Sequence, residues 1–149
     1  MTIESTCDRD LIRQIILHPK VFHFRSLADG ITPENFALPA GLYLLARDET
    51  GPLGVFYLHA QNPRLWQVHV AFLPKAWGHK TVRAGQAGLA WLQAETGCRK
   101  LLALIPGFND VALDYVERIG GIRCGTIPEA TEQAGVLYDE YAYVVEVKA

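Results

Sequence analysis

A strand, a loop, a long helix and a second strand follow one another between residues 65 and 105, and this unit constrains the fold most. Residues 65–73 are rich in β-branched and aromatic side chains and end at Pro74, which predicts a strand. Residues 81–95 carry apolar and small side chains at helical spacing, and the apolar run 100–105 predicts a buried strand. Two strands joined through a helix pair in parallel, so the sheet contains at least one parallel pair.

The segments before this unit change from helical to β periodicity. Residues 8–18 carry apolar side chains at helical spacing, and Pro19 should end that helix. Residues 21–35 are mixed, and Thr32 before Pro33 predicts a cap followed by a short second helix or a turn. Two β-rich runs, 41–47 and 54–59, lie on either side of a Gly/Pro turn and predict an antiparallel hairpin.

The chain ends with one more helix and two strands. Residues 110–119 predict a helix that stops at Gly120-Gly121, and residues 122–126 and 141–147 predict the strands. Between these strands we expect an acidic loop, which holds Glu129, Glu132, Asp139 and Glu140. The expected order α-α-β-β-β-α-β-α-β-β describes an α+β, or mixed α/β, fold in a single domain of residues 1–149.

Composition excludes several classes of protein. A formal net charge of −2 over 149 residues provides no basic surface for nucleic acid. Three cysteines without repeated spacing argue against a disulfide framework, and no pair has the spacing of metal ligands. No signal peptide or long apolar segment is evident, so we expect a cytoplasmic protein with no metal and no membrane partner.

The connection between the residue 65–73 strand and the helix after it is the first candidate site. A strand–loop–helix junction presents free backbone N–H groups at the positive end of the helix dipole, which suits a phosphate or pyrophosphate. An ordinary structural connection would show the same single glycine, so both interpretations stand at this point. The loop, counted from Pro74, reads Trp77-Gly78-His79-Lys80-Thr81-Val82.

The order of elements and this loop together resemble the GNAT superfamily of acyl-CoA-dependent N-acetyltransferases. That family follows a hydrophobic strand with a loop of the form [R/Q]-x-x-G-x-[G/A]. Gly78 matches a glycine that commonly follows the motif's Arg, whereas Trp77 replaces Arg or Gln, and Lys80 and Val82 replace small residues. The resemblance implies that the loop grips the pyrophosphate of acetyl-CoA mainly through backbone amides, with Lys80 either offering a cation or remaining solvated.

A second segment is similar to the family's N-x-x-[A/S] pattern at the start of the next helix. Asn109 and Ala112 match, and Gly120 matches the glycine at the end of that helix. Asn109 would cap the helix and, by resemblance, hydrogen-bond the pantetheine arm of the cofactor. The Ala-Trp-Gly loop and the Ile-Pro…Asn segment are also similar to acetyltransferase-like proteins often met in phage and prophage genomes. The implied fold is a twisted, mostly antiparallel sheet with one parallel pair, flanked by helices.

The resemblance implies direct attack of an amine on the thioester of acetyl-CoA. The main chain of Val70, Ala71 and Phe72 would then run along the acetyl and pantetheine groups. His69 is the candidate base, because an imidazole titrates near neutrality, although a buried, hydrogen-bonded structural histidine is the alternative. Many family members place a tyrosine acid where this chain has Val116, so Tyr115, one residue earlier, is the candidate acid only if the helix is slipped.

The most specific function that the sequence supports is N-acetyl transfer from acetyl-CoA to an amine, in a ternary complex. The acceptor is either a small-molecule amine or a protein amino group. The resemblance implies that the acidic loop borders the acceptor site, where it could attract a cationic amine; a solvated face without such a role is the alternative. A non-catalytic GNAT-like module that only binds CoA is the first alternative, and a viral structural or interaction protein on the same scaffold is the second. The sequence leaves the oligomeric state open, a homodimer included.

Overall fold

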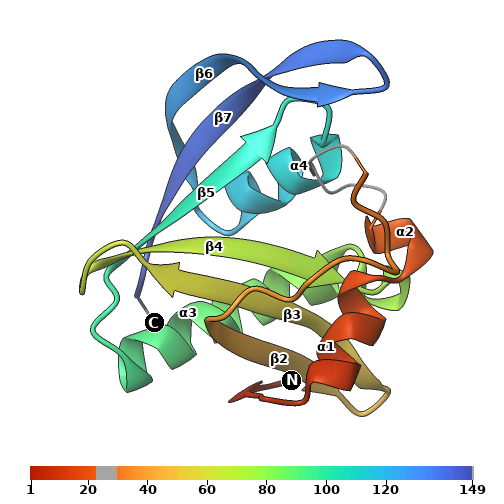
Figure 1. The fold of residues 1–149 in the computed structure, drawn as a ribbon. Coiled ribbons are helices and arrows are strands. Elements are labelled where there is room, and N and C mark those ends of the chain that lie inside the picture. Colours follow the sequence, from red (N-terminus) through yellow and green to blue (C-terminus); the bar gives the residue numbers. More distant parts are fainter. Residues whose placement is uncertain (23–29, 149) are drawn as a thin grey trace.

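The computed structural model describes residues 1–22 and 30–148. One mixed sheet of seven strands, in the order β1-β2-β3-β4-β5-β7-β6, forms the centre of the protein (Figure 1). Only β4 and β5 pair in parallel within the described chain. The strands are β1 (Thr2–Ser5), β2 (Leu42–Asp48), β3 (Gly51–Ala60), β4 (Leu65–Phe72), β5 (Lys100–Pro106), β6 (Ile122–Gln133) and β7 (Val136–Glu146). This arrangement confirms the predicted mixed α/β fold and its parallel pair.

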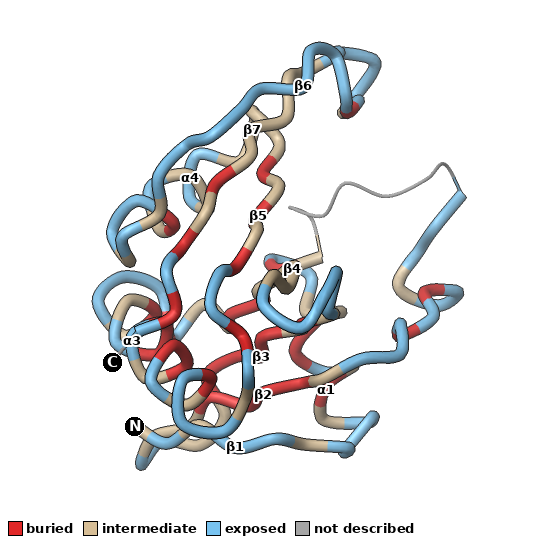
Figure 2. Tube along the Cα trace, turned by 90° about the vertical axis from the view of Figure 1, so that its left-hand side faces the viewer, coloured by how far each residue is buried: buried red, intermediate tan, exposed pale blue. Residues whose placement is uncertain are grey.

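Helices cover both faces of the sheet. They are α1 (Arg9–Ile16), α2 (Pro19–Phe22), α3 (His79–Glu95) and α4 (Asp110–Arg118), with a 3-10 helix η1 (Pro74–Ala76) before α3. Helices α3 and α4 share one hydrophobic core with the sheet, and α1 and α2 share another on the opposite face. Leu44 belongs to the first core and its neighbour Leu45 to the second, as expected for a strand buried on both sides. Figure 2 shows this burial along the central strands.

Small residues on α3 allow close packing, as the sequence predicts. A Cβ atom on Gly85 would lie 2.4 Å from the Tyr115 hydroxyl oxygen of α4, and one on Gly88 would lie 3.4 Å from the Phe56 ring of β3. The position of Gly85 therefore lets α3 approach α4, whereas that of Gly88 lets it approach the sheet. Within the described residues, no helix has the length and apolar character that crossing a membrane requires.

Three segments differ from the sequence-based expectation. Strand β1 is unpredicted; it pairs with β2 at the edge of the sheet. Of the short helix or turn expected near Thr32, the structure has the turn, from Thr32 to Asn35, and a short helix lies earlier than expected, from Pro19 to Phe22; residues 23–29 lie outside the described residues. The prediction of an acidic loop is wrong. Most of the expected loop belongs to the strands of the long β6–β7 hairpin, which turns at Ala134-Gly135.

Candidate functional site

The parallel pair of β4 and β5 is short, and the two strands separate beyond it. Pairing extends only from Leu65 to Gln67 on β4 and from Lys100 to Leu102 on β5. Residues 68–72 remain paired to β3 along one edge, so their other edge presents main-chain N–H and C=O groups to the gap. An extended ligand can pair with such an edge as an additional strand would.

The separation opens a cleft of about 400 Å³. One part of its wall comes from the α3 and α4 face, where Gly85, Gly88 and Val116 lie. Gln67 and His69 line another part, and they alternate along β4 with the residues that pack toward α3. The cleft therefore connects the two faces of the sheet, and a ligand held on one face can meet a second molecule on the other.

Helix α3 begins at the expected loop with a backbone conformation that requires glycine. Gly78 precedes the first helical residue with φ 100° and ψ −137°, a region that residues with a Cβ rarely occupy. The N–H groups of the first helical residues have no acceptor within the helix, which makes this end suitable for an anion. The Trp77 indole N–H donates to the Phe72 carbonyl at 2.9 Å and so fastens the loop to the end of β4.

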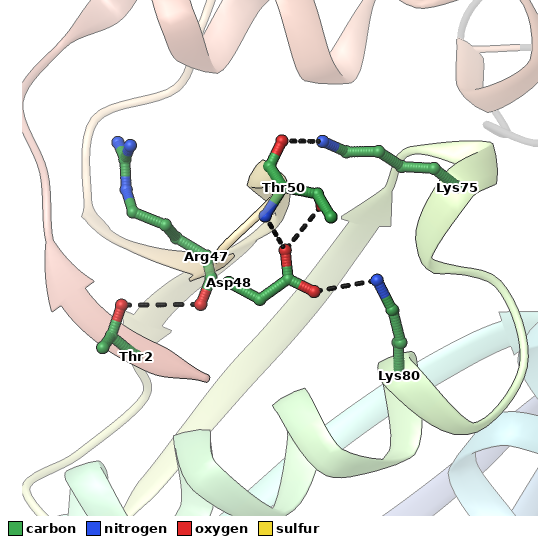
Figure 3. Close-up of polar contacts among 6 residues, drawn as sticks. All are labelled: Thr2, Arg47, Asp48, Thr50, Lys75 and Lys80. Atoms are coloured by element: carbon green, nitrogen blue, oxygen red, sulfur yellow. Dashed lines mark hydrogen bonds and ion pairs between the residues drawn. The ribbon is translucent and has the colours of Figure 1, made fainter.

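Lys80 has a protein partner. Its Nζ donates to Oδ2 of Asp48 at 2.8 Å, and the Asp48 side chain is only 7% exposed (Figure 3). The hydrogen bond from Lys80, together with two from Thr50, holds the pKa of Asp48 well below its usual range. Lys75 reaches the same turn and donates to the Thr50 carbonyl at 2.9 Å. The contact of Lys80 with pyrophosphate stays a prediction. It requires the Lys80 ammonium group either to leave Asp48 or to contact Asp48 and the pyrophosphate at the same time.

Asn109 lies at the start of α4. Its Oδ1 accepts the backbone N–H of Ala112 at 3.1 Å, which confirms the predicted cap of α4. The residue also lines the cleft. Among the described residues, no hydrogen bond uses its Nδ2 group, so this amide can donate to a ligand without breaking the cap.

His69 lies on β4 opposite Tyr57 of β3, on the face of the sheet that α1 and α2 cover. Its ring belongs to a cluster of three stacked rings, with its centroid 5.5 Å from that of Tyr57 and 5.7 Å from that of His59. The Tyr57 hydroxyl donates to the Ala40 carbonyl at 2.8 Å, which fixes the ring that His69 packs against. His69 also lines the cleft, so its imidazole is oriented by packing and lies beside the space for a ligand.

Tyr115 packs between α4 and α3, as a residue one position before the expected acid should. Its ring meets Phe72 edge to face at 5.8 Å between centroids, and its hydroxyl is buried against Gly85. That hydroxyl has no hydrogen-bond partner among the described residues. Burial raises the pKa of Tyr115 above its ordinary value. Proton donation would therefore require the side chain to move and would draw on a weaker acid.

The other predicted cofactor residues divide into two groups. Val70 lines the cleft, whereas Ala71 and Phe72 point their side chains into the two cores and offer only their main chain. The loop residues lie outside the cleft lining, at the start of α3; of these, His79 is exposed, Val82 is half-buried, and Thr81 is buried with its hydroxyl donating to the Gly78 carbonyl at 2.6 Å.

Asp48 is missing from the sequence-based candidates, and Glu140 lies elsewhere than expected. Asp48 falls in the predicted turn between the two hairpin strands, and its contact with Lys80 joins positions 32 apart in the chain. The sequence predicts Glu140 in an acidic loop, whereas the structure places it on β7, from which it lines the cleft. A lone acid in a turn or a strand has no sequence signal that would identify its role; only the pairing of distant segments reveals it.

Comparison with solved structures identifies proteins of similar fold. No family model matches the chain, and no curated protein matches its sequence. A spermidine N-acetyltransferase from Vibrio cholerae, solved in complex with CoA and spermine, is similar with a TM-score of 0.78 and 13% identity; the match covers 98% of this chain and 95% of that one. A GNAT-family acetyltransferase from Streptococcus pneumoniae gives a TM-score of 0.72 and 12% identity, covering 99% of each chain. The protein therefore has the fold of GNAT acetyltransferases, as the sequence predicts.

Proposed function

We propose that the protein is an N-acetyltransferase that binds acetyl-CoA in the gap between β4 and β5 and transfers the acetyl group to an amine by direct attack. The observation that carries this proposal is the cleft that connects the two faces of the sheet beside the open edge of β4. The CoA bound in the spermidine N-acetyltransferase of the same fold supports the choice of cofactor. The acceptor is a small-molecule amine or a protein amino group.

The residues present fit acetyl-CoA, because its pyrophosphate and its pantetheine arm each have candidate partners. Backbone N–H groups at Gly78, His79 and Lys80 suit the pyrophosphate, because they lie at the positive end of α3. The open edge of residues 68–72 suits the amide groups of the pantetheine arm, with Asn109 Nδ2 as a further donor. When bound, acetyl-CoA supplies the activated acetyl thioester.

The acceptor amine must lose a proton, since an alkylammonium group has a pKa of about 10.4. His69 is our candidate base, because it lines the cleft on the face opposite α3 and α4 and its ring is held by stacking. A main-chain N–H on the open edge of β4, between Val70 and Phe72, is our candidate donor to the acetyl oxygen as negative charge develops there. The base is His69 and the donor is a main-chain group, so neither role depends on the side chains of residues 70–72. These side chains can therefore be apolar.

Tyr115 remains the sequence-based candidate for the acid that protonates the leaving sulfur. Its shielded hydroxyl makes this the weaker of the two catalytic assignments. A thiol has a pKa of about 8.5, below that of any tyrosine with a normal or raised pKa, so protonation of the sulfur by Tyr115 is uphill. The sulfur can instead leave as the thiolate and equilibrate with protons of the bulk solvent, in which a thiol with a pKa of about 8.5 is mostly protonated at pH 7.

A non-catalytic CoA-binding module is the second candidate. The observation in its favour is that the Tyr115 hydroxyl is buried while Val116 occupies the position where many family members have the acid. Both candidates expect cofactor binding, and only the first expects turnover.

Two assays on the whole protein separate the possibilities. We expect millimolar acetyl-CoA to raise the melting temperature, because a ligand that binds only the folded state stabilises it by mass action. We then expect release of free CoA thiol when primary amines are added with acetyl-CoA. Stabilisation without thiol release over a broad panel of amines would favour the binding module. Absence of both would overturn the proposed function.

A further inference from the structure

Among the described residues that line the cleft, Glu140 carries the one formally charged side chain, and its position suits an acceptor-binding role. Along β7, Tyr141, Tyr143 and Val145 pack into the core beneath α3 and α4. Glu140 alternates with these residues and so points to the opposite face of the sheet, the face on which His69 lies. Both residues line the same cleft from strands on either side of β5.

The carboxylate of Glu140 is not used by the fold. Among the described residues no ion pair or hydrogen bond involves it. Other acids on or beside β7 do have partners: Asp139 Oδ1 accepts the Glu129 N–H at 3.1 Å, and Glu146 is paired with Lys100. The cleft thus has an available negative charge where the acceptor would enter.

No lysine or arginine of the described chain lines the cleft. The nearest cation on the hairpin, Arg123, lies over the Tyr141 ring at 3.9 Å, and Tyr141 packs toward the other face. An acceptor that carries a carboxylate would therefore face Glu140 with no counter-ion. An acceptor with a second ammonium group would have the Glu140 carboxylate as its counter-ion.

The distance between the two groups suits an extended acceptor. Glu140 pairs with Pro106 on β5, and β5 lies between β7 and β4. Two strand spacings of about 4.8 Å each therefore separate the Glu140 and His69 backbones across the sheet, and the separation of β4 from β5 adds to this distance. Leu104 and Pro106 occupy the wall between them and offer apolar contact. A flexible alkyl chain would place one amine at His69 and the other at Glu140.

We propose that Glu140 is a specificity-determining residue that selects aliphatic diamines, whose second ammonium group it binds, over monoamines and amino acids. This inference rests on the proposed acetyl transfer. The reaction forms an amide bond between the attacking nitrogen and the acetyl carbon and breaks the carbon–sulfur bond of the thioester. The amine proton goes to His69 and the sulfur leaves as CoA thiol, while the distant ammonium group stays charged.

Three acceptors of matched chain length test the preference on the wild-type protein: 1,5-diaminopentane, pentylamine and 5-aminopentanoate. We expect kcat/KM for CoA release to be about tenfold lower for the monoamine than for the diamine, after correction for the two equivalent amino groups of the diamine. We expect a further fall for the amino acid. Equal rates for the diamine and the monoamine would overturn the inference without using any variant.

The variant Glu140→Gln tests the residue itself, with Glu132→Gln as control. The control removes the same charge from an exposed position on the same hairpin, outside the cleft lining. We expect Glu140→Gln to lower kcat/KM about tenfold for the diamine and less than twofold for pentylamine, and the control to change neither. Equal losses for both acceptors would overturn the assignment. Failure of every amine to release CoA would refute the proposed function, and this inference with it.

Discussion

Replacement of Tyr115 by phenylalanine should stabilise the protein, although most substitutions of buried residues do the opposite. The Tyr115 hydroxyl is buried against Gly85 and has no hydrogen-bond partner among the described residues. A buried hydroxyl without a partner costs about 1–3 kcal/mol relative to its hydrated state. Tyr115→Phe removes that cost and leaves the ring contact with Phe72 in place. We expect a gain of roughly 1–2 kcal/mol in the free energy of unfolding.

For a domain of this length, each 1 kcal/mol shifts the melting temperature by about 2–4 °C, so the gain corresponds to roughly 2–8 °C. Thermal unfolding followed by circular dichroism measures it. Tyr43→Phe is the matched control, because the buried Tyr43 hydroxyl donates to the Pro39 carbonyl at 2.7 Å. Loss of that bond should lower stability by about 1 kcal/mol, so the two substitutions should shift the melting temperature in opposite directions.

A double-mutant cycle with Gly85→Ala tests the same geometry from the other helix. The new Cβ would lie 2.4 Å from the Tyr115 hydroxyl oxygen and 3.0 Å from Ile119, so the single substitution should cost about 1–3 kcal/mol. In the Tyr115→Phe background the closer contact is gone, and part of that cost should disappear as a coupling free energy between the two sites.

Two results would refute this reasoning. A lower melting temperature for Tyr115→Phe would mean that the hydroxyl has a stabilising partner in solution. Unchanged or higher stability together with a fall of more than tenfold in kcat would mean that the hydroxyl reaches the reaction centre, and Tyr115 would then be the acid after all. We expect kcat to stay within twofold of the wild type.

Three further substitutions test the loop and the base. Gly78→Ala should destabilise the protein by about 1–2 kcal/mol and weaken acetyl-CoA binding, because φ 100° strains any residue with a Cβ; calorimetric titration measures the affinity. Asp48→Asn should lower the melting temperature at pH 7. The difference from wild type should begin to shrink as the pH falls below 3.8, the ordinary pKa, and should vanish only below the still lower folded-state pKa of Asp48, where the ion pair with Lys80 is lost on protonation. His69→Gln should lower kcat/KM about 100-fold at neutral pH and remove the rising limb of the pH profile, with acetyl-CoA affinity unchanged.

Each of these has a control or a contradicting outcome. Gly120→Ala introduces a Cβ at φ 96°, also with open space around it, at the end of α4; it should destabilise similarly and leave acetyl-CoA affinity intact. A pH-independent difference for Asp48→Asn would mean that its carboxylate is not paired in solution. An unchanged pH profile for His69→Gln would remove His69 as the base.

The sequence predicts the part of the fold in which periodicity and local breakers coincide. Helix α1 has Asp8 as its cap and apolar residues on one face, and α3 is predicted from residue 81 but begins two residues earlier, directly after Gly78 of the predicted loop. Asn109 is predicted for the same reason, since a cap acts on residues three positions away.

The missed features depend on partners far along the chain. Nearly all residues of β6 are exposed, so the strand shows no alternation, and its Gly, Pro and Glu content resembles a loop; pairing with β7 alone makes it a strand (Figure 2). Strand β1 is four residues long and mostly exposed, and its pairing with β2 decides its conformation. The roles of Asp48 and Glu140 likewise follow from register and packing, which spacing in the sequence does not encode.

The crystal structure of the protein with acetyl-CoA tests the central claim most directly. We expect the pyrophosphate at the N–H groups that begin α3, the pantetheine arm paired with the open edge of residues 68–72, and the acetyl group in the cleft beside His69. Acetyl-CoA bound elsewhere with this edge unpaired, or no bound molecule at millimolar concentration, would contradict it.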